Sequence, residues 1–163
     1  MNSVEMSIAI ARYFDTRLNI IVPNVSWGIG IHECDVLIIT KSGYAIEVEI
    51  KTSKADIKAD LKKSHAHNSK KLRSLIFAIP KKLEYCIDLI PETAGIITID
   101  RLETKLPYRD NMIGPMPSRL YCTMLRKAKI NIHAEKLSDK DILHVAKLGV
   151  MRMWNLKEKL KGL

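Results

Sequence analysis

The sequence predicts an α/β domain in which a mixed β-sheet is flanked by helices on both sides. Between residues 44 and 100, apolar runs of strand length alternate with amphipathic stretches of helix length. The runs 74–79 and 94–100 are almost continuously apolar, which is typical of strands buried on both faces. Because parallel strands joined by helices take right-handed crossovers, this order predicts a sheet with helices on both sides. With 163 residues, the chain is long enough for one domain with its own hydrophobic core.

The N-terminal segment predicts a helix followed by an interrupted strand. Residues 2–15 carry apolar side chains at helical spacing after Ser3, which we expect to cap the helix. The next apolar run contains Pro23, which should interrupt a strand. Glycines within 28–30 then predict a loop that leads to the next strand.

A β-hairpin and a helix form the centre of the prediction. The runs DVLIIT (35–40) and YAIEVEI (44–50) read as two strands joined by a turn at residues 41–43. Residues 54–66 mix apolar and charged side chains without a helix breaker, so we expect a helix there, capped by Thr52 or Ser53.

The second half of the predicted sheet is read from its apolar runs. Residues 67–73 are polar and basic and predict a loop, and the strand 74–79 follows. A short helix is expected over 81–90, before the strand 94–100. The segment 101–118 is rich in proline and charge and predicts irregular structure or a short edge hairpin.

Two helices are expected at the C-terminus, forming an extension over about 116–163 beside a core of about 1–100. The first should span roughly 117–128, and the second should begin at Ser138, with Asp141 completing its cap, and run to about Lys161. The second helix has an apolar band wider than one stripe. It should pack on the core, and it could also supply a dimer surface.

Composition favours a polyanionic partner such as DNA. Lys and Arg number 27 against 18 Asp and Glu, a formal net charge of +9. The three cysteines, at positions 34, 86 and 122, are widely spaced and form no CxxC pair, which indicates core thiols in a reducing compartment. No apolar run is long enough to span a membrane, so we expect a cytoplasmic protein without a membrane partner.

Charged side chains are concentrated on one face of the predicted hairpin. Glu47, Glu49 and Lys51 occupy alternate positions of its second strand, so the two-residue period places them on one face. The other face is apolar, with Ile46, Val48 and Ile50. This pattern indicates either a metal site or a solvated strand face that carries a cross-strand ion pair.

The spacing of these residues supports the metal site. Asp35, thirteen further residues and then Glu49-Ile50-Lys51 match the PD-(D/E)xK motif, so the chain resembles the restriction-endonuclease-like nuclease superfamily. The predicted elements also follow the αβββαβ order of that superfamily's core. Over about residues 33–100, the segments EVEIKTSKADIKADLKK, SLIFAIP and ETAGIITID look most similar to the MmcB-like DNA-repair branch.

A site of this kind would hold Mg²⁺ or Mn²⁺ through hard oxygen ligands. The carboxylates of Asp35 and Glu49 and the main-chain carbonyl of Ile50 would be ligands. Lys51 would hold the attacking water and stabilise charge on the phosphoryl oxygens. The catalytic residues are therefore predicted to be Asp35, Glu49 and Lys51.

Other residues are weaker candidates for the same site. The resemblance implies an acid on the first helix, which would make Glu5 a further metal ligand, although a lone helical Glu is usually solvated. Glu47 could approach a second metal, and Glu33 carries the same expectation. A basic stretch after the site could follow phosphates or form a solvated face; it contains Lys62, Lys63, His65, Lys70, Lys71 and Arg73.

The sequence therefore predicts a metal-dependent DNA endonuclease or DNA-repair nuclease that hydrolyses phosphodiester bonds. A homodimer or a larger nuclease or repair complex would be compatible with it. The alternative is a non-catalytic DNA-binding module of the same fold in a repair or mobile-element complex. A third interpretation, a protein-interaction domain, requires that the chain not bind nucleic acid at low salt.

Overall fold

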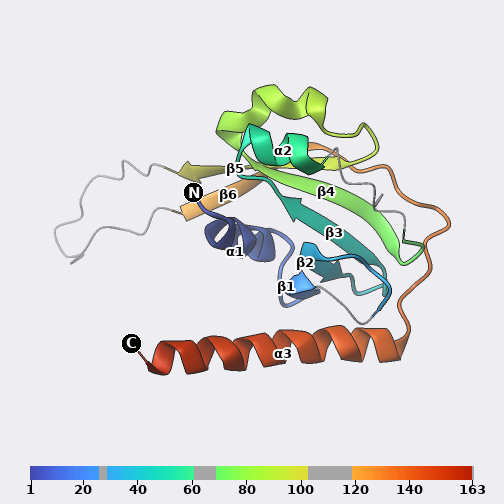
Figure 1. Cartoon of the computed structure of the whole chain (residues 1–163). Coiled ribbons are helices and arrows are strands. Elements are labelled where there is room, and N and C mark those ends of the chain that lie inside the picture. Colours follow the sequence, from blue (N-terminus) through green and yellow to red (C-terminus); the bar gives the residue numbers. More distant parts are fainter. Residues whose placement is uncertain (26–28, 61–68, 103–118, 163) are drawn as a thin grey trace.

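The computed structural model describes residues 1–25, 29–60, 69–102 and 119–162, which build a mixed β-sheet with helices on both faces (Figure 1). The predicted α/β class is confirmed. In chain order the elements are α1 (Ser3–Tyr13), β1 (Ile20–Val25), β2 (Cys34–Ile39), β3 (Ala45–Ile50), α2 (Lys54–Asp60), β4 (Leu72–Pro80), the 3₁₀ helix η1 (Lys81–Leu89), β5 (Gly95–Leu102), β6 (Arg119–Arg126) and α3 (Asp139–Lys161).

The six described strands lie side by side in sequence order. Strands β1, β2 and β3 are antiparallel, β3, β4 and β5 are parallel, and β6 is antiparallel to β5. The elements from α1 to β4 follow the αβββαβ order predicted from the sequence. Gly43 makes the predicted turn between β2 and β3 with a φ of +85°, a conformation that glycine adopts without steric cost.

One face of the sheet packs against α1. Met6, Ala9 and Ile10 of this helix meet the apolar side chains that point to that face from the central strands. The second strand of the hairpin contributes the predicted apolar alternation here, with Val48 fully buried and Ile50 7% exposed.

The opposite face carries two separate apolar clusters. Ile57 of α2 and Leu83 of η1 pack over Phe77 in one of them. Val145 and Leu148 of α3 pack over β1 and β2 in the other. Residue Glu47 lies between these clusters, because its register partners are Leu37 on β2 and Leu75 on β4.

The segment after residue 118 differs from the prediction. Residues 119–126 form strand β6 and not the first C-terminal helix. Their backbone pairs with β5, and their side chains alternate between exposed and half-buried. Leu120, Cys122 and Met124 point toward the α1 cluster with the two-residue period of a strand. The predicted helical extension therefore consists of a strand and one helix.

The helix ends partly confirm the predicted caps. Ser138 and Asp141 form the expected capping box at the start of α3. Helix α1 is capped by Asn2 and not by Ser3, because the Asn2 side chain accepts from the amide of Glu5 and the Glu5 side chain reaches back. Helix α2 is described to Asp60, so the rest of the predicted helix lies outside the described residues. The segment 103–118, predicted to be irregular or a short hairpin, also lies outside them.

Two other expectations concern proline and cysteine. Pro23 does not interrupt its strand, because it lies within β1 at the edge of the sheet, where a missing amide is tolerated. The three cysteines are free, and those at 34 and 86 are buried. None of the described helices has the length and apolar character to cross a membrane.

Candidate functional site

The three predicted catalytic residues lie together where the neighbouring strands β2 and β3 end, at the edge of the sheet that is formed by strand ends. Asp35 lies at the start of β2, Glu49 lies near the end of β3 and Lys51 follows it. Because β2 and β3 are antiparallel, the start of one strand lies beside the end of the other. Asp35 and Ile50 line one shallow hollow together with the first turns of α1.

Asp35 is held at the point where the β2–β3 ladder stops. The last paired residues are Val36 and Val48, and beyond them the Oδ2 atom of Asp35 accepts the backbone N–H of Ile50 at 2.7 Å. The N–H and C=O of one strand residue point to the same side, so the Ile50 carbonyl also faces the β2 side of the strand. This places the main-chain oxygen predicted as a ligand on the side of Asp35.

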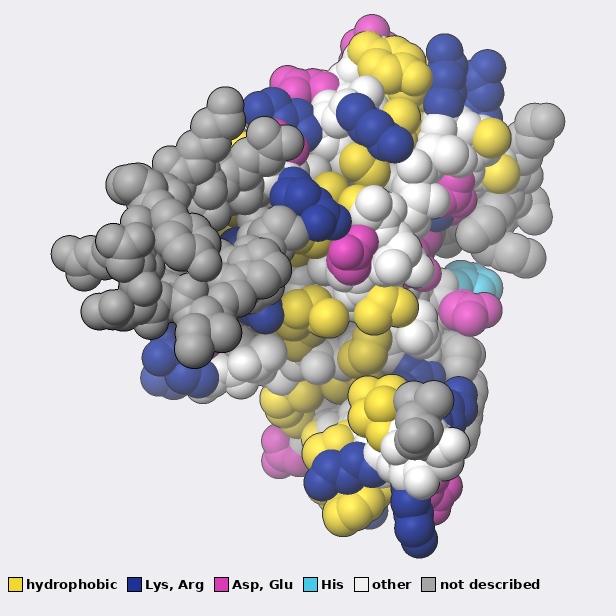
Figure 2. Space-filling view, turned by 90° about the vertical axis from the view of Figure 1, so that its left-hand side faces the viewer, with side chains coloured by type: hydrophobic (Ala, Val, Ile, Leu, Met, Phe, Trp, Pro, Cys, Tyr) yellow, Lys and Arg dark blue, Asp and Glu magenta, His cyan; other side chains and the backbone are white. Residues whose placement is uncertain are grey.

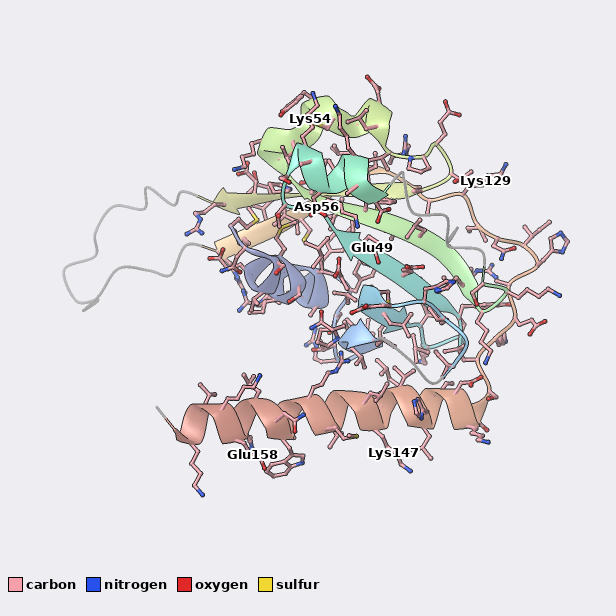
Figure 3. The ribbon with its side chains drawn as sticks, in the orientation of Figure 1. Glu49, Lys54, Asp56, Lys129, Lys147 and Glu158 are labelled. Carbon is pink, nitrogen blue, oxygen red and sulfur yellow. The ribbon has the colours of Figure 1, made fainter. Side chains whose placement is uncertain are left out.

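Glu49 and Lys51 form a buried ion pair with a third residue. The Lys51 ammonium donates to Glu49 Oε2 at 2.8 Å and to Asp60 Oδ1 at 2.7 Å. Glu49 and Lys51 are each 4% exposed. The ammonium also lies 5.7 Å from the centre of the Phe77 ring. Figure 3 shows Glu49 on β3 beneath α2, the helix that supplies Asp60.

Burial changes the protonation of this pair. Burial raises the pKa of Glu49 above its ordinary value, although the hydrogen bond from Lys51 acts in the opposite direction. Burial alone would lower the pKa of Lys51, but its bonds to Asp60 and Glu49 outweigh burial and raise it. Lys51 is therefore a protonated donor at neutral pH and cannot serve as a general base.

The solvated strand face considered from the sequence is wrong. Glu47 is 1% exposed, and Glu49 and Lys51 are hardly more accessible. Carboxylates are costly to bury unless cations or hydrogen bonds compensate them. Lys51 supplies such a cation for Glu49 and Asp60, so these side chains form a buried, charge-paired cluster.

Asp60 was not among the predicted site residues. The signal in the sequence was the Ala-Asp pair at 55–56, repeated at 59–60, because residues four apart share one face of a helix. The structure separates their roles. Asp56 accepts the backbone N–H of Thr52 and helps to start α2, whereas Asp60 reaches Lys51.

Glu5 has other partners in this structure. Its carboxylate accepts the backbone N–H of Asn2 at 2.9 Å and a hydrogen bond from Arg101 at 3.2 Å. The bond from Asn2 is the main reason that its pKa is lowered. A ligand role for Glu5 stays a prediction, and it would compete with these bonds.

The predicted basic stretch lies partly at the far edge of the sheet. Lys62, Lys63 and His65 lie outside the described residues. The other three lie near the start of β4; they are Lys70, Lys71 and Arg73. The start of β4 is six residues, or about 20 Å along the strand, from Ala78, which pairs with Ile50. Lys71 bonds to Asp141 at 2.9 Å, and Arg73 stacks 4.0 Å from the centre of the Tyr44 ring. Their phosphate-binding role stays a prediction.

The donor set at the sheet edge fits a hard divalent cation. It offers the carboxylates of Asp35 and Glu49 and the main-chain oxygen of Ile50, and Mg²⁺ and Mn²⁺ prefer such oxygen ligands. Among the described residues, no three His, Cys, Asp or Glu side chains converge into a metal-binding group. The proposed centre depends on two side chains and one backbone oxygen, so this finding does not conflict with it.

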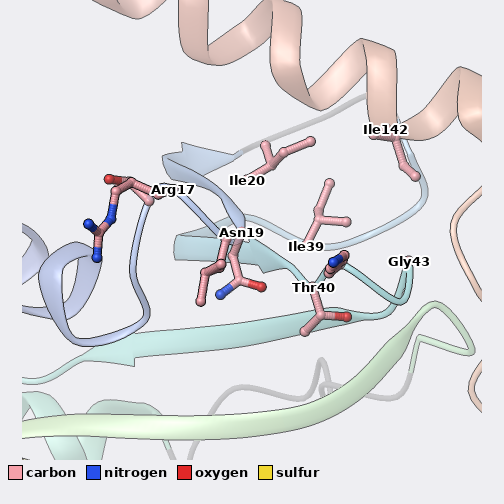
Figure 4. Close-up of a pocket in the computed structure, with 10 residues that line it drawn as sticks. Arg17, Asn19, Ile20, Ile39, Thr40, Gly43 and Ile142 are labelled. Atoms are coloured by element: carbon pink, nitrogen blue, oxygen red, sulfur yellow. The ribbon is translucent and has the colours of Figure 1, made fainter.

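Two further hollows lie away from the acidic residues. The pocket in Figure 4 lies at the other end of β2 from Asp35, between the segment before β1, the hairpin turn and Ile142 of α3. An open groove of about 620 Å³ runs between α1 and β6. Three arginines line this groove, Arg12, Arg17 and Arg119.

Comparison with known proteins identifies the fold alone. No protein-family model and no curated protein matches this chain. A solved structure of a protein of unknown function from Silicibacter pomeroyi, SPO1766, is similar, with a TM-score of 0.63 and 16% sequence identity. The similarity covers 99% of this chain and 92% of that chain. A similar fold therefore occurs in another protein.

Proposed function

We propose that this protein is a metal-dependent nuclease that hydrolyses phosphodiester bonds in DNA. The observation that carries the proposal is the meeting of Asp35, Glu49 and Lys51 at one sheet edge, where Asp35 bonds to the backbone of Ile50 and Lys51 bonds to Glu49. The spacing of these residues resembles the PD-(D/E)xK motif. Asp35 and Glu49 lie on strands and Lys51 directly follows one, in the αβββαβ order of such nucleases.

In this proposal Asp35, Glu49 and the Ile50 carbonyl hold Mg²⁺ or Mn²⁺. When bound, the cation would acidify a water molecule and neutralise charge on the scissile phosphate. Water attacks phosphorus and releases one proton to solvent, the bond from phosphorus to the leaving oxygen breaks, and the leaving oxygen takes up a proton from solvent. Lys51 orients the water and stabilises the charge that grows on the phosphoryl oxygens.

The protonated state of Lys51 agrees with that role. Its raised pKa keeps it a hydrogen-bond donor throughout the neutral range. Asp60 also accepts a hydrogen bond from the ammonium, so Asp60 would act as a positioning residue. Loss of Asp60 should therefore weaken catalysis without removing a metal ligand.

Charge supports a nucleic acid substrate. The net charge of +9 favours a polyanion. The groove between α1 and β6 also suits phosphates, since guanidinium groups bind phosphate oxygens in a fork geometry. Arg12 and Arg119 line it, whereas Arg17 is paired there with Asp15. Helix α1 connects the two places, because its first turns line the hollow beside Asp35 and its last turn lines the groove.

The test combines calorimetry with cleavage. Mn²⁺ or Mg²⁺ is titrated into wild type, Asp35→Asn, Glu49→Gln and the surface control Asp88→Asn, an exposed acid on η1. Supercoiled plasmid and mixed linear and branched DNA are then incubated with each protein and the metal. We expect metal binding and nicking by wild type and the control, and loss of both in the two site variants. Full cleavage by Asp35→Asn or by Lys51→Met would contradict the mechanism.

A second candidate is a non-catalytic DNA-binding module. The observation that favours it is the burial of Glu49 and Lys51, which bond to each other and are each 4% exposed. A catalytic lysine must reach a substrate phosphate, and this one is held away from solvent. In this case all four proteins would bind DNA equally and none would nick it.

A further inference from the structure

Helix α3 exposes far more apolar surface than its packing on the sheet requires. Its 23 residues run along one side of the molecule (Figure 1). Among them Val145 and Leu148 are the buried residues, and they pack toward β1. Large apolar side chains elsewhere on α3 are 45–58% exposed; they are Leu143, Val150, Met151, Met153, Trp154, Leu156 and Leu160. Exposed apolar area of this extent on one element marks an interaction site.

Part of this surface has the spacing of a helix–helix seam. Leu143 and Val150 are seven residues apart, and so are Met153 and Leu160. The second pair begins three residues after Val150. Alternating steps of three and four residues place an apolar stripe along a helix, as the a and d positions of a coiled coil do. At 3.6 residues per turn, Leu143 and Val150 lie about 160° and about 140° around the helix from the buried Val145, whereas Leu160 lies about 60° from it. The first half of the seam is therefore separate from the face that packs on the sheet, and Leu160 is 57% exposed although it lies closer to the direction of that face.

Charge on α3 is divided between its ends. The first turn carries Asp139 and Asp141, and the last turn carries Lys159 and Lys161. Asp141 already pairs with Lys71, and Lys140 lies beside Asp139, so the first turn is only weakly acidic whereas the last turn is basic. A parallel second copy would bring the two basic ends together, whereas an antiparallel copy would place each basic end beside the weakly acidic first turn. Figure 2 shows basic side chains around apolar ones at the free end of α3, at the bottom of the view.

We propose that α3 is a self-association surface on which a second copy of this chain packs its own α3 antiparallel to the first. In the register that brings the seams together, Leu143 faces the partner's Leu160, and Val150 faces the partner's Met153. The same register leaves the weakly acidic first turn next to the partner's basic last turn. Because a two-fold axis relates the helices, each contact occurs twice.

The first test measures mass against concentration. Light scattering coupled to gel filtration, from 5 to 500 μM at low salt, compares wild type with Val150→Glu and with Ile132→Glu. Ile132 is the matched control, a β-branched residue that is 80% exposed and lies outside α3. We expect dimers for wild type and for Ile132→Glu, and a dissociation constant at least tenfold weaker for Val150→Glu. Val150 is 52% exposed, and thermal unfolding checks that its variant remains folded.

The second test determines the direction of the pair. Residues 143 and 160 are about 25 Å apart on one helix, so they cannot form a disulfide within a chain. Leu143→Cys combined with Leu160→Cys should give covalent dimers on oxidation, whereas Leu143→Cys alone should not exceed the wild-type background from its free thiols. A wild type that is monomeric throughout, a Val150→Glu variant that dimerises equally well, or efficient cross-linking by Leu143→Cys alone would each overturn the proposal. Nicking and metal binding by the same proteins test the nuclease proposal separately.

Discussion

Replacement of Lys51 by methionine should destabilise the protein strongly and in a pH-dependent way. Methionine is unbranched and nearly as long as lysine, but it lacks the ammonium, which lies 5.7 Å from the centre of the Phe77 ring. Two short charge-assisted hydrogen bonds, at 2.7 and 2.8 Å, are lost from a site that is 4% exposed. Removal of one partner from a buried ion pair typically costs about 3–5 kcal/mol of unfolding free energy. We expect a loss in that range at pH 8.

The loss should become smaller in acid. Without the ammonium, the folded-state pKa of Glu49 rises still further above its unfolded value, which is about 4.3 for an ordinary glutamate. The folded variant then binds protons that the unfolded chain has already released. Its stability relative to wild type is therefore greatest near pH 4 and is lost as the pH rises through the raised pKa of Glu49.

Urea unfolding at pH 5 and pH 8, followed by circular dichroism, measures both effects. The matched control is Lys81→Met, because Lys81 pairs with Asp100 at 3.3 Å on the surface, where its side chain is 56% exposed. This control should stay close to wild type at both pH values. Equal stability of the two variants, or a loss for Lys51→Met that does not change with pH, would refute the buried counter-ion role of Lys51.

Three further changes test other parts of the structure. Glu49→Gln should be at least as stable as wild type at pH 8, because burial disfavours the ionised acid. Mg²⁺ or Mn²⁺ should raise the Tm of wild type but not the Tm of Glu49→Gln. Gly95→Ala should cost about 2 kcal/mol or more in urea unfolding, since its Cβ would lie 2.9 Å from the backbone nitrogen of Ala128. Neutralisation of Arg12 and Arg119 to Gln should lower the salt slope of DNA binding, read by fluorescence anisotropy, by about two; an unchanged slope would exclude the groove from the DNA path.

Much of the fold could be predicted because its central elements carry strong local signals. The hairpin has alternating strands and a turn with Gly43, and the strands β4 and β5 contain the mainly apolar runs 75–79 and 95–99. The strand β6 was misread as a helix, although Leu120, Cys122 and Met124 already show a two-residue period. An edge strand with one half-buried face has a weak apolar signal, and its pairing with β5 depends on residues far away in the sequence.

The proximity of the candidate site residues could be predicted from the sequence, but their hydrogen bonds could not. The motif spacing predicted that Asp35, Glu49 and Lys51 lie together, and their role as a site stays a proposal. The bond from Ile50 to Asp35 depends on where the β2–β3 ladder ends, which no local pattern records. Asp60 reaches Lys51 only because Ile57 fixes α2 against the sheet, and that docking is a tertiary effect.

The β1 edge of the sheet has a consequence for how the protein behaves when concentrated. A bare edge strand presents backbone donors and acceptors that can recruit another chain. On β1 the ring of Pro23 removes a donor, and Asn24 bends the strand with a φ of +51°. This edge is thus a poor template for a further strand, so the sheet should resist growth from β1 into fibrils even at concentrations at which helices on different copies meet.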